Sequence, residues 1–177
     1  VEGIEVAQFM RERNVAFSAS ALRPNTRFYP FFEGASGIDI IPKLIEITMR
    51  NGTFEIGETV RGFNGTTEIF ACRAAVTNHK TGSFDAPTRT YGTNPYDREE
   101  LVPQSYSASS TILNVDLDSL ADISDDRFGG LIATGVRLVG ESSGAVADVR
   151  DIRLVSDGFG EVLGSFFFRN PYAEPAP

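Results

Sequence analysis

Apolar and polar residues alternate in short stretches along most of the chain, and turns that contain glycine or proline separate these stretches. Val15, Phe17 and Ala19 share one face of a predicted strand over residues 13–19, because side chains two positions apart point to the same side of a strand. The helical period is not sustained anywhere, so the pattern predicts a mainly β protein. Further strands are predicted at residues 43–49, 69–76, 111–117, 131–138, 146–155 and 162–168.

Asparagine–glycine and aspartate–glycine pairs mark the predicted turns. Asn51-Gly52 supplies the two positive-φ residues of a type I′ turn, and the alternation resumes at Phe54 and Ile56. This arrangement predicts a hairpin with the strand over residues 43–49. Other turns are predicted at Asn64-Gly65, at residues 79–82 and at Asp157-Gly158, the last closing a hairpin onto residues 162–168.

The predicted strands make one or two small antiparallel sandwich or barrel-like modules joined by a long loop. The loop covers residues 83–110, which are poor in aliphatic residues and rich in Pro, Thr, Tyr and Ser. Three units are expected: an N-terminal β segment over residues 1–36, a β-hairpin module with the loop over 37–104, and a C-terminal β-hairpin module over 105–177.

The N-terminal segment contains a corner followed by an aromatic run that ends at Gly34. The spacing Leu22-x-Pro24-x-Thr26-x-Phe28 is similar to the corner of fibronectin-type and other Ig-like sandwiches, in which the last position is usually Tyr. Because Phe28 has no hydroxyl, the hydrogen bond of that corner is not expected.

Composition removes several classes of protein. The 177 residues carry a formal net charge of −8, whereas a nucleic-acid-binding surface needs a basic face. No stretch approaches the roughly 20 apolar residues of a membrane-spanning helix. Lysine occurs only at Lys43 and Lys80 and arginine supplies the other basic residues, a bias that favours protein contacts. Cys72, the sole cysteine, is expected to be a small buried apolar residue in a strand.

One motif has the form of a catalytic site. Residues 140–144 match the G-x-S-x-G pattern of a nucleophile elbow, with Ser142 as the nucleophile. That chemistry needs a histidine after the serine, but the only histidine, His79, precedes it. We therefore interpret the motif as a Gly/Ser turn and expect no catalytic residue and no enzyme activity. His79 itself is expected on the surface, because no nearby cysteine or histidine could share a zinc ion with it.

An acidic run follows the predicted strand over residues 111–117. It lacks the glycine and the terminal glutamate of an EF-hand loop, although an irregular calcium site stays open as an alternative. We expect one or two helical turns over residues 118–123, with Asp116 or Asp118 as the N-cap. No metal site and no cofactor are assigned. The run consists of Asp116, Asp118, Asp122, Asp125 and Asp126.

Three tyrosines of the long loop, Tyr91, Tyr96 and Tyr106, are candidates for an interaction surface. Exposed rings could stack on sugars or contact a protein. The alternative, which we weigh slightly higher, is that they pack the loop onto the sheet.

Several stretches resemble large virion proteins of tailed bacteriophages, especially tail, baseplate or fibre-associated proteins of contractile-tailed, cyanophage-like viruses. Together the stretches cover most of the chain, and their order makes the resemblance more specific than any one of them. They are residues 13–15 and 22–34, residues 41–47 and 52–60, residues 106–116, and residues 143–149 and 164–168.

This resemblance implies a non-enzymatic structural protein of the virion, located in the phage tail. Segments of this kind are modules of longer polypeptides in that family, so the chain is expected to be a fragment of one. The implied partners are other virion proteins and further copies of the chain in a homo-oligomer, with no nucleic acid and no membrane. The alternative function is a receptor-binding or glycan-binding module of a tail fibre, which would contact a host surface glycan through the loop tyrosines.

Overall fold

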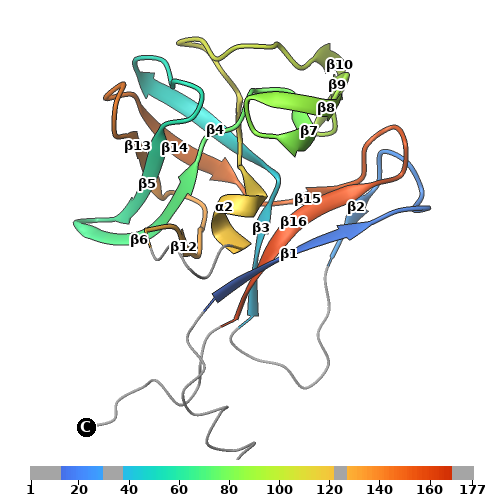
Figure 1. Ribbon diagram of the computed structural model, residues 1–177, viewed down its shortest axis with the longest axis horizontal. Coiled ribbons are helices and arrows are strands. Elements are labelled where there is room, and N and C mark those ends of the chain that lie inside the picture. The colour runs from blue at the N-terminus through green and yellow to red at the C-terminus, as the bar shows by residue number, and fades with distance from the viewer. Residues whose placement is uncertain (1–12, 30–37, 122–126, 169–177) are drawn as a thin grey trace, which may run out of the picture.

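The computed structural model describes residues 13–29, 38–121 and 127–168, and these residues form antiparallel β-sheets with one short helix (Figure 1). The prediction of a mainly β, antiparallel fold is confirmed. The strands are β1 (Arg13–Ala19), β2 (Arg27–Phe28), β3 (Ile38–Pro42), β4 (Leu44–Asn51), β5 (Thr59–Asn64), β6 (Thr67–Arg73), β7 (His79–Ser83), β8 (Ala86–Thr90), β9 (Thr93–Asn94), β10 (Asp97–Leu101), β11 (Ile112–Asn114), β12 (Gly129–Gly130), β13 (Arg137–Gly140), β14 (Val146–Asp151), β15 (Leu154–Val155) and β16 (Val162–Phe168), and the helix is α2 (Leu117–Ala121).

The largest sheet has seven strands in the order β11-β4-β14-β13-β5-β6-β12 and curls around the main core. Alternate residues of its strands point inward, and the side chains of Val60, Leu113 and Leu138 are fully buried. Cys72 is also fully buried, as predicted, and burial raises the pKa of its thiol. The strand alternation therefore builds one continuous apolar interior on the concave side of this sheet.

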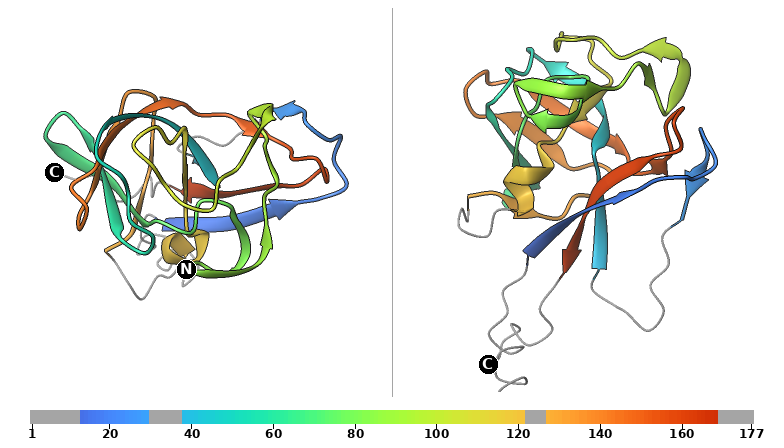
Figure 2. Two further views of the ribbon diagram at one scale, coloured as in Figure 1. Left: turned by 90° about the horizontal axis from the view of Figure 1, so that it is seen from above. Right: turned by 45° about the vertical axis from the view of Figure 1, so that its right-hand side comes forward.

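A second sheet, in the order β1-β16-β3, joins the two ends of the described chain. β16 lies between the other two strands: its Phe168 pairs with Arg13 of β1, and its Phe166 pairs with Ile40 of β3. Figure 1 and the right-hand view of Figure 2 show these strands beside α2, below the seven-stranded sheet. Strands from residues 1–36, 37–104 and 105–177 thus share sheets, so the three predicted units do not correspond to separate sheets.

The prediction of a hairpin at Asn51-Gly52 is wrong, although the chain does bend there. Gly52 has φ +75°, and a Cβ at this position would lie 3.1 Å from the Cα of Ala145. The edge of β4 is already occupied by β14, in which Val146 pairs with Asn51. The residues after Gly52 therefore pass on to β5, which pairs with β6 and β13.

Other predicted glycine turns are formed, but the turn predicted at residues 79–82 is wrong, because His79–Ser83 is strand β7. β5 and β6 make a hairpin around Asn64-Gly65, and Gly65 has φ +66°. The Gly140–Gly144 segment is a turn between β13 and β14. A turn also forms at Asp157–Gly160, but it does not join the predicted strands to each other: β15 pairs with β2, whereas β16 pairs with β1 and β3.

The segment predicted as a long loop contains short strands. β7 pairs with β8 and β9 pairs with β10, so residues 79–101 fold into small hairpins at the upper right of Figure 1. The sequence hides them because their exposed residues are mostly polar and lack the usual alternation.

The corner of the N-terminal segment packs against the turn at residues 157–160. The amide of Leu22 donates to the carbonyl of Gly160 (2.9 Å), and the amide of Thr26 donates to Ser156 Oγ (2.9 Å). Phe28 pairs with Leu154. The aromatic run beyond residue 29, at 30–34, lies outside the described residues.

The helix α2 begins after Asp116, as predicted. The amide of Asp118 donates to Asp116 Oδ1 (3.3 Å), so Asp116 is the cap. Asp122, Asp125 and Asp126 lie outside the described residues. None of the helical structure that is described has the length and apolar character of a membrane span.

Candidate functional site

The interior next to α2 contains a buried amine. Lys43 lies between β3 and β4, and the residue is 2% exposed. Its Nζ donates to the carbonyl of Val115 (2.6 Å) and lies 2.8 Å from Nδ1 of His79. Burial lowers the pKa of Lys43 to about 7, because the ammonium form loses its water, although Asp116 and Asp118 oppose this shift.

His79 is buried as well, so its predicted position on the surface is wrong. Its Nε2 lies 2.9 Å from the carbonyl oxygen of Gly82, which can only accept a hydrogen bond. Nε2 therefore carries the hydrogen, and Nδ1 accepts from Lys43. Burial, and then the charge of Lys43, lower the pKa of His79, so the imidazole is neutral at neutral pH.

The side-chain amide of Asn114 fixes this arrangement. Its Nδ2 donates to the carbonyl oxygens of Thr77 (2.9 Å) and His79 (2.7 Å), which ties the start of β7 to β11. Asn114 is fully buried, and its Oδ1 and the Thr77 hydroxyl are buried atoms without a hydrogen-bond partner among the described residues. Polar groups thus reach deep into the interior at this point.

A cavity of about 290 Å³ lies beside these groups, between β1, β7 and the start of α2. Lys43, His79 and Asp116 line it together with Ser18 and Thr81. Burial raises the pKa of Asp116, although Lys43 counteracts this effect. The cavity therefore places an amine with a near-neutral pKa, which can exchange protons near pH 7, beside a neutral imidazole.

The second lysine, Lys80, lies on β7 one residue after His79, and 1% of its side chain is exposed. Its Nζ contacts the carboxylate of Asp157 and lies 2.5 Å from Glu161 Oε1. Arg89 Nη2 also binds Glu161, at 2.8 Å. Hydrogen bonds from Lys80 and Arg89 lower the pKa of Glu161.

Asp157 is the centre of the turn that follows β15, and its side chain is 6% exposed. One oxygen, Oδ1, accepts hydrogen bonds from the amides of Phe159 (2.8 Å) and Glu161 (3.0 Å). The other oxygen, Oδ2, faces Lys80. The rings of Tyr91 and Phe159 lie 5.4 Å and 5.1 Å from Lys80 Nζ. The amine of Lys80 and the carboxyl group of Asp157 thus meet where both side chains are almost fully buried.

Sequence reasoning missed both lysines and their partners as a site. Two signals were available: lysine is scarce in this chain, and Lys43 lies inside the apolar run of residues 40–45. A charged residue within an apolar run is an unusual core residue unless it is paired. No comparable signal marks Asp157 or Glu161, because an aspartate before glycine is already explained by the turn.

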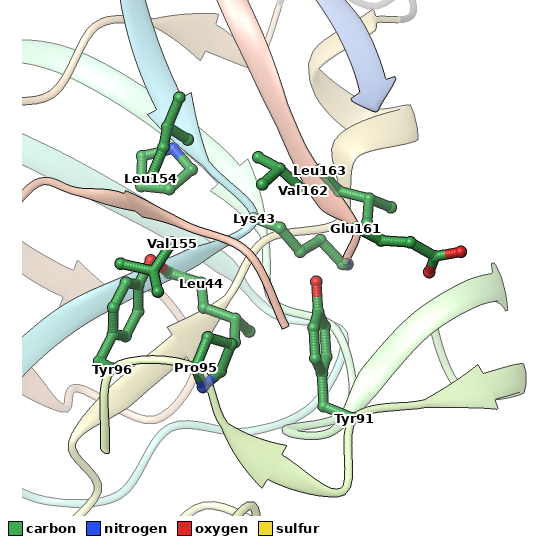
Figure 3. A pocket seen from close by; sticks show the side chains of 11 residues that line it. Lys43, Leu44, Tyr91, Pro95, Tyr96, Leu154, Val155, Glu161, Val162 and Leu163 are labelled. Atoms are coloured by element: carbon green, nitrogen blue, oxygen red, sulfur yellow. The ribbon is translucent and has the colours of Figure 1, made fainter. Parts of the chain in front are cut away.

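The loop tyrosines are placed in the interior. Tyr91 is 7% exposed, and Tyr96 is half-buried with its hydroxyl donating to the carbonyl of Leu44 (2.6 Å). Figure 3 shows both rings on either side of Pro95, beneath the strand that carries Val155. The cavity between these side chains has a volume of about 10 Å³. Burial raises the pKa of both tyrosines.

Tyr106 is buried too, and its hydroxyl donates to the carbonyl of Ala75 (2.6 Å) while it accepts from the amide of Asn114 (3.1 Å). Burial raises its pKa. All three tyrosines therefore fit the packing alternative, and their placement does not favour a sugar-stacking surface at these residues.

Ser142 and His79 are held by different partners. The amides of Ser142 and Ser143 both donate to Glu58 Oε1 (2.9 Å), and the hydroxyl of Ser143 donates to Glu58 Oε2 (2.7 Å). His79 instead bonds to Lys43 and Gly82. Glu58 thus stabilises the turn at residues 140–144, and the structure does not bring a serine–histidine pair together at these positions.

Within residues 13–29, 38–121 and 127–168, no group of three or more His, Cys, Asp or Glu side chains is arranged to hold a metal ion. Three of the five aspartates of the acidic run lie outside these ranges, so the calcium alternative is untested there.

Comparison with protein-family models, with curated proteins and with solved structures gives no match to this chain.

Proposed function

We propose that the chain is a non-enzymatic structural module of a phage tail, baseplate or fibre, which assembles with other virion proteins and with further copies of itself. The ordered resemblance along the sequence supports the assignment to a virion. An antiparallel β scaffold with a hydrogen-bonded interior supports a docking role, because such a scaffold holds surface side chains in fixed positions.

The observation that carries the docking role is Phe159, whose residue surface is 76% exposed. It lies in the turn at residues 157–160, which the side chain of Asp157 and the amide of Leu22 fix from two sides. Figure 1 places this turn at the right-hand tip, beside the corner that precedes β2. An exposed aromatic residue on a turn that is fixed in this way loses little backbone entropy on binding, which favours a role as an interface anchor.

The first experiment measures self-assembly of the purified chain by size-exclusion chromatography with multi-angle light scattering over a range of concentrations. We expect a discrete oligomer, and we expect Phe159→Ser to shift it toward the monomer. Leu101→Ser is the matched control, because Leu101 is 73% exposed but lies on β10. A monomer for the unmodified chain at every concentration would remove self-assembly from the proposal.

The second experiment tests the location. Phage particles purified from a lysate of cells infected with the virus that encodes the chain are digested and analysed by mass spectrometry. The proposal predicts peptides of the chain in the particles at a constant ratio to a tail protein. Peptides found in the soluble lysate but absent from the particles would overturn the assignment to the virion.

A further inference from the structure

The side chains of Lys80 and Asp157 come from distant parts of the chain and meet with little access to water. Lys80 Nζ contacts Asp157 Oδ2, and the exposed fractions of the two side chains are 1% and 6%. Lys80 lies on β7, and Asp157 lies in the turn between β15 and β16. Well-oriented reacting groups within one molecule can reach effective concentrations on the order of 10⁵ M, so holding an amine and a carboxyl group in contact favours reaction between them.

We propose that Lys80 and Asp157 become joined by an amide bond between Nζ and Cγ. A proton first passes from Nζ to Oδ2, which turns the contact into a neutral amine and a carboxylic acid. The Nζ lone pair then attacks Cγ, the N–C bond forms, and the Cγ–Oδ2 bond breaks. Nζ gives up two hydrogens in all, counting the one already passed to the carboxyl group, and Oδ2 leaves with both as water. No oxidant, reductant or metal is required.

The oxygen of Asp157 that stays on the carbonyl carbon, Oδ1, already has hydrogen-bond donors that can stabilise the negative charge that develops on it during this attack. Oδ1 accepts hydrogen bonds from the main-chain amides of Phe159 (2.8 Å) and Glu161 (3.0 Å). Two main-chain donors on one oxygen are the usual means of stabilising a tetrahedral intermediate of acyl transfer. Oδ2, the oxygen that leaves, is the one that faces the amine.

Glu161 is in position to move the proton. Its Oε1 lies 2.5 Å from Lys80 Nζ, and Arg89 holds the same oxygen at 2.8 Å. The lowered pKa of Glu161 keeps it ionised, so it can accept a proton from the attacking nitrogen and pass it to the departing oxygen. Lys80 also lines the cavity of about 290 Å³, which can receive the water molecule that is released.

Lys43 provides the internal comparison. It is as deeply buried as Lys80, but its Nζ bonds to an imidazole nitrogen and a main-chain carbonyl, neither of which can acylate it. The same chemistry is therefore expected at Lys80 and not at Lys43. This inference does not depend on the proposed function.

The deciding experiment is mass spectrometry of the purified full chain under denaturing conditions, in which an ion pair dissociates and an amide bond persists. The intact mass is expected to be lower than the sequence mass by one water molecule. Trypsin is expected to stop cleaving after Lys80 and to release a branched peptide that contains Lys80 and Asp157. An intact mass equal to the sequence mass, with normal cleavage after Lys80 even after prolonged incubation, overturns the proposal.

Variants separate the roles of the residues. Lys80→Arg keeps the cation but cannot form the amide, so its mass should equal its sequence mass. Lys43→Arg, the matched control, should still lose one water molecule. Glu161→Gln should slow the loss of water at least tenfold, and loss at the unmodified rate would remove Glu161 from the mechanism. If the same mass deficit persists in Lys80→Arg, the deficit does not arise at Lys80 and the proposal fails.

Discussion

The two lysines of the chain occupy neighbouring interior regions that treat an ammonium group in different ways. Lys43 has neutral partners, the Nδ1 of His79 and a carbonyl oxygen, and its pKa falls to about 7. Lys80 meets two carboxyl groups, those of Asp157 and Glu161. Burial is nearly the same, so the chemistry of the partners, and not the depth, distinguishes the two regions.

This difference decides what each lysine can contribute. Around Lys43, loss of water is compensated only in part, so the ammonium form is disfavoured and the group titrates near neutral pH. Around Lys80, carboxyl oxygens and aromatic rings surround the same kind of nitrogen. The first region is suited to proton exchange beside a cavity, and the second to a tight link between β7 and the turn after β15.

The largest effect is expected from Lys80→Met. The substitution removes the nitrogen that binds Asp157, whether as an ion pair or as an amide, and leaves a buried carboxylate without its partner. We expect the free energy of unfolding to fall by about 3–5 kcal/mol. Urea unfolding followed by circular dichroism measures this change. A loss below about 1 kcal/mol would mean that Asp157 finds enough compensation in its two backbone amides, and the contrast with Lys43 would disappear.

The second prediction concerns the pH dependence that Lys43 introduces. The pKa of Lys43 is about 7 in the folded chain, whereas an unfolded lysine has a pKa of about 10.4. Between these values the unfolded chain binds more protons, so the stability should rise with pH through this window. The contribution approaches about 1.4 kcal/mol per pH unit.

Urea unfolding of the unmodified chain and of Lys43→Met at pH 7, 7.75 and 8.5 tests this contribution, because the variant lacks the amine. The unmodified chain should gain stability relative to the variant as the pH rises. Parallel curves would show that Lys43 keeps an ordinary pKa when buried, in which case the two lysine regions would not differ in their titration.

The sequence predicts several of the longer strands and some of the bends, but it misses the short strands of residues 79–101 and does not show which strands become neighbours. Asn64-Gly65 joins adjacent strands as expected, because nothing else pairs with that side of β5 at the turn. Asn51-Gly52 has the same chemistry, yet β14 pairs with β4 and displaces the expected hairpin. A turn signal is local, whereas strand pairing depends on residues about a hundred positions away.

The lysine regions show a similar limit. Periodicity places Ile45 and Ile47 on one face of a strand, and both are buried. The apolar run of residues 40–45 could have drawn attention to Lys43. The position of His79 could not be inferred in this way, because its neighbours Asn78 and Lys80 suggest a polar turn. His79 is buried because β11, through Asn114, binds the main chain of β7. Long-range hydrogen bonds of this kind leave no local pattern.

The smallest effect is expected from Arg89→Ala, at the outer rim of the Lys80 region. The Arg89 side chain is 48% exposed and binds Glu161, which also contacts Lys80. Because exposed ion pairs are well solvated, the free energy of unfolding should fall by less than about 1 kcal/mol, and by less still in high salt. Urea unfolding at low and high ionic strength measures the loss of unfolding free energy and its dependence on salt. A loss as large as that of Lys80→Met would mean that Arg89 holds the whole cluster together, and that the buried contact between Lys80 and Asp157 is not what distinguishes this region from that of Lys43.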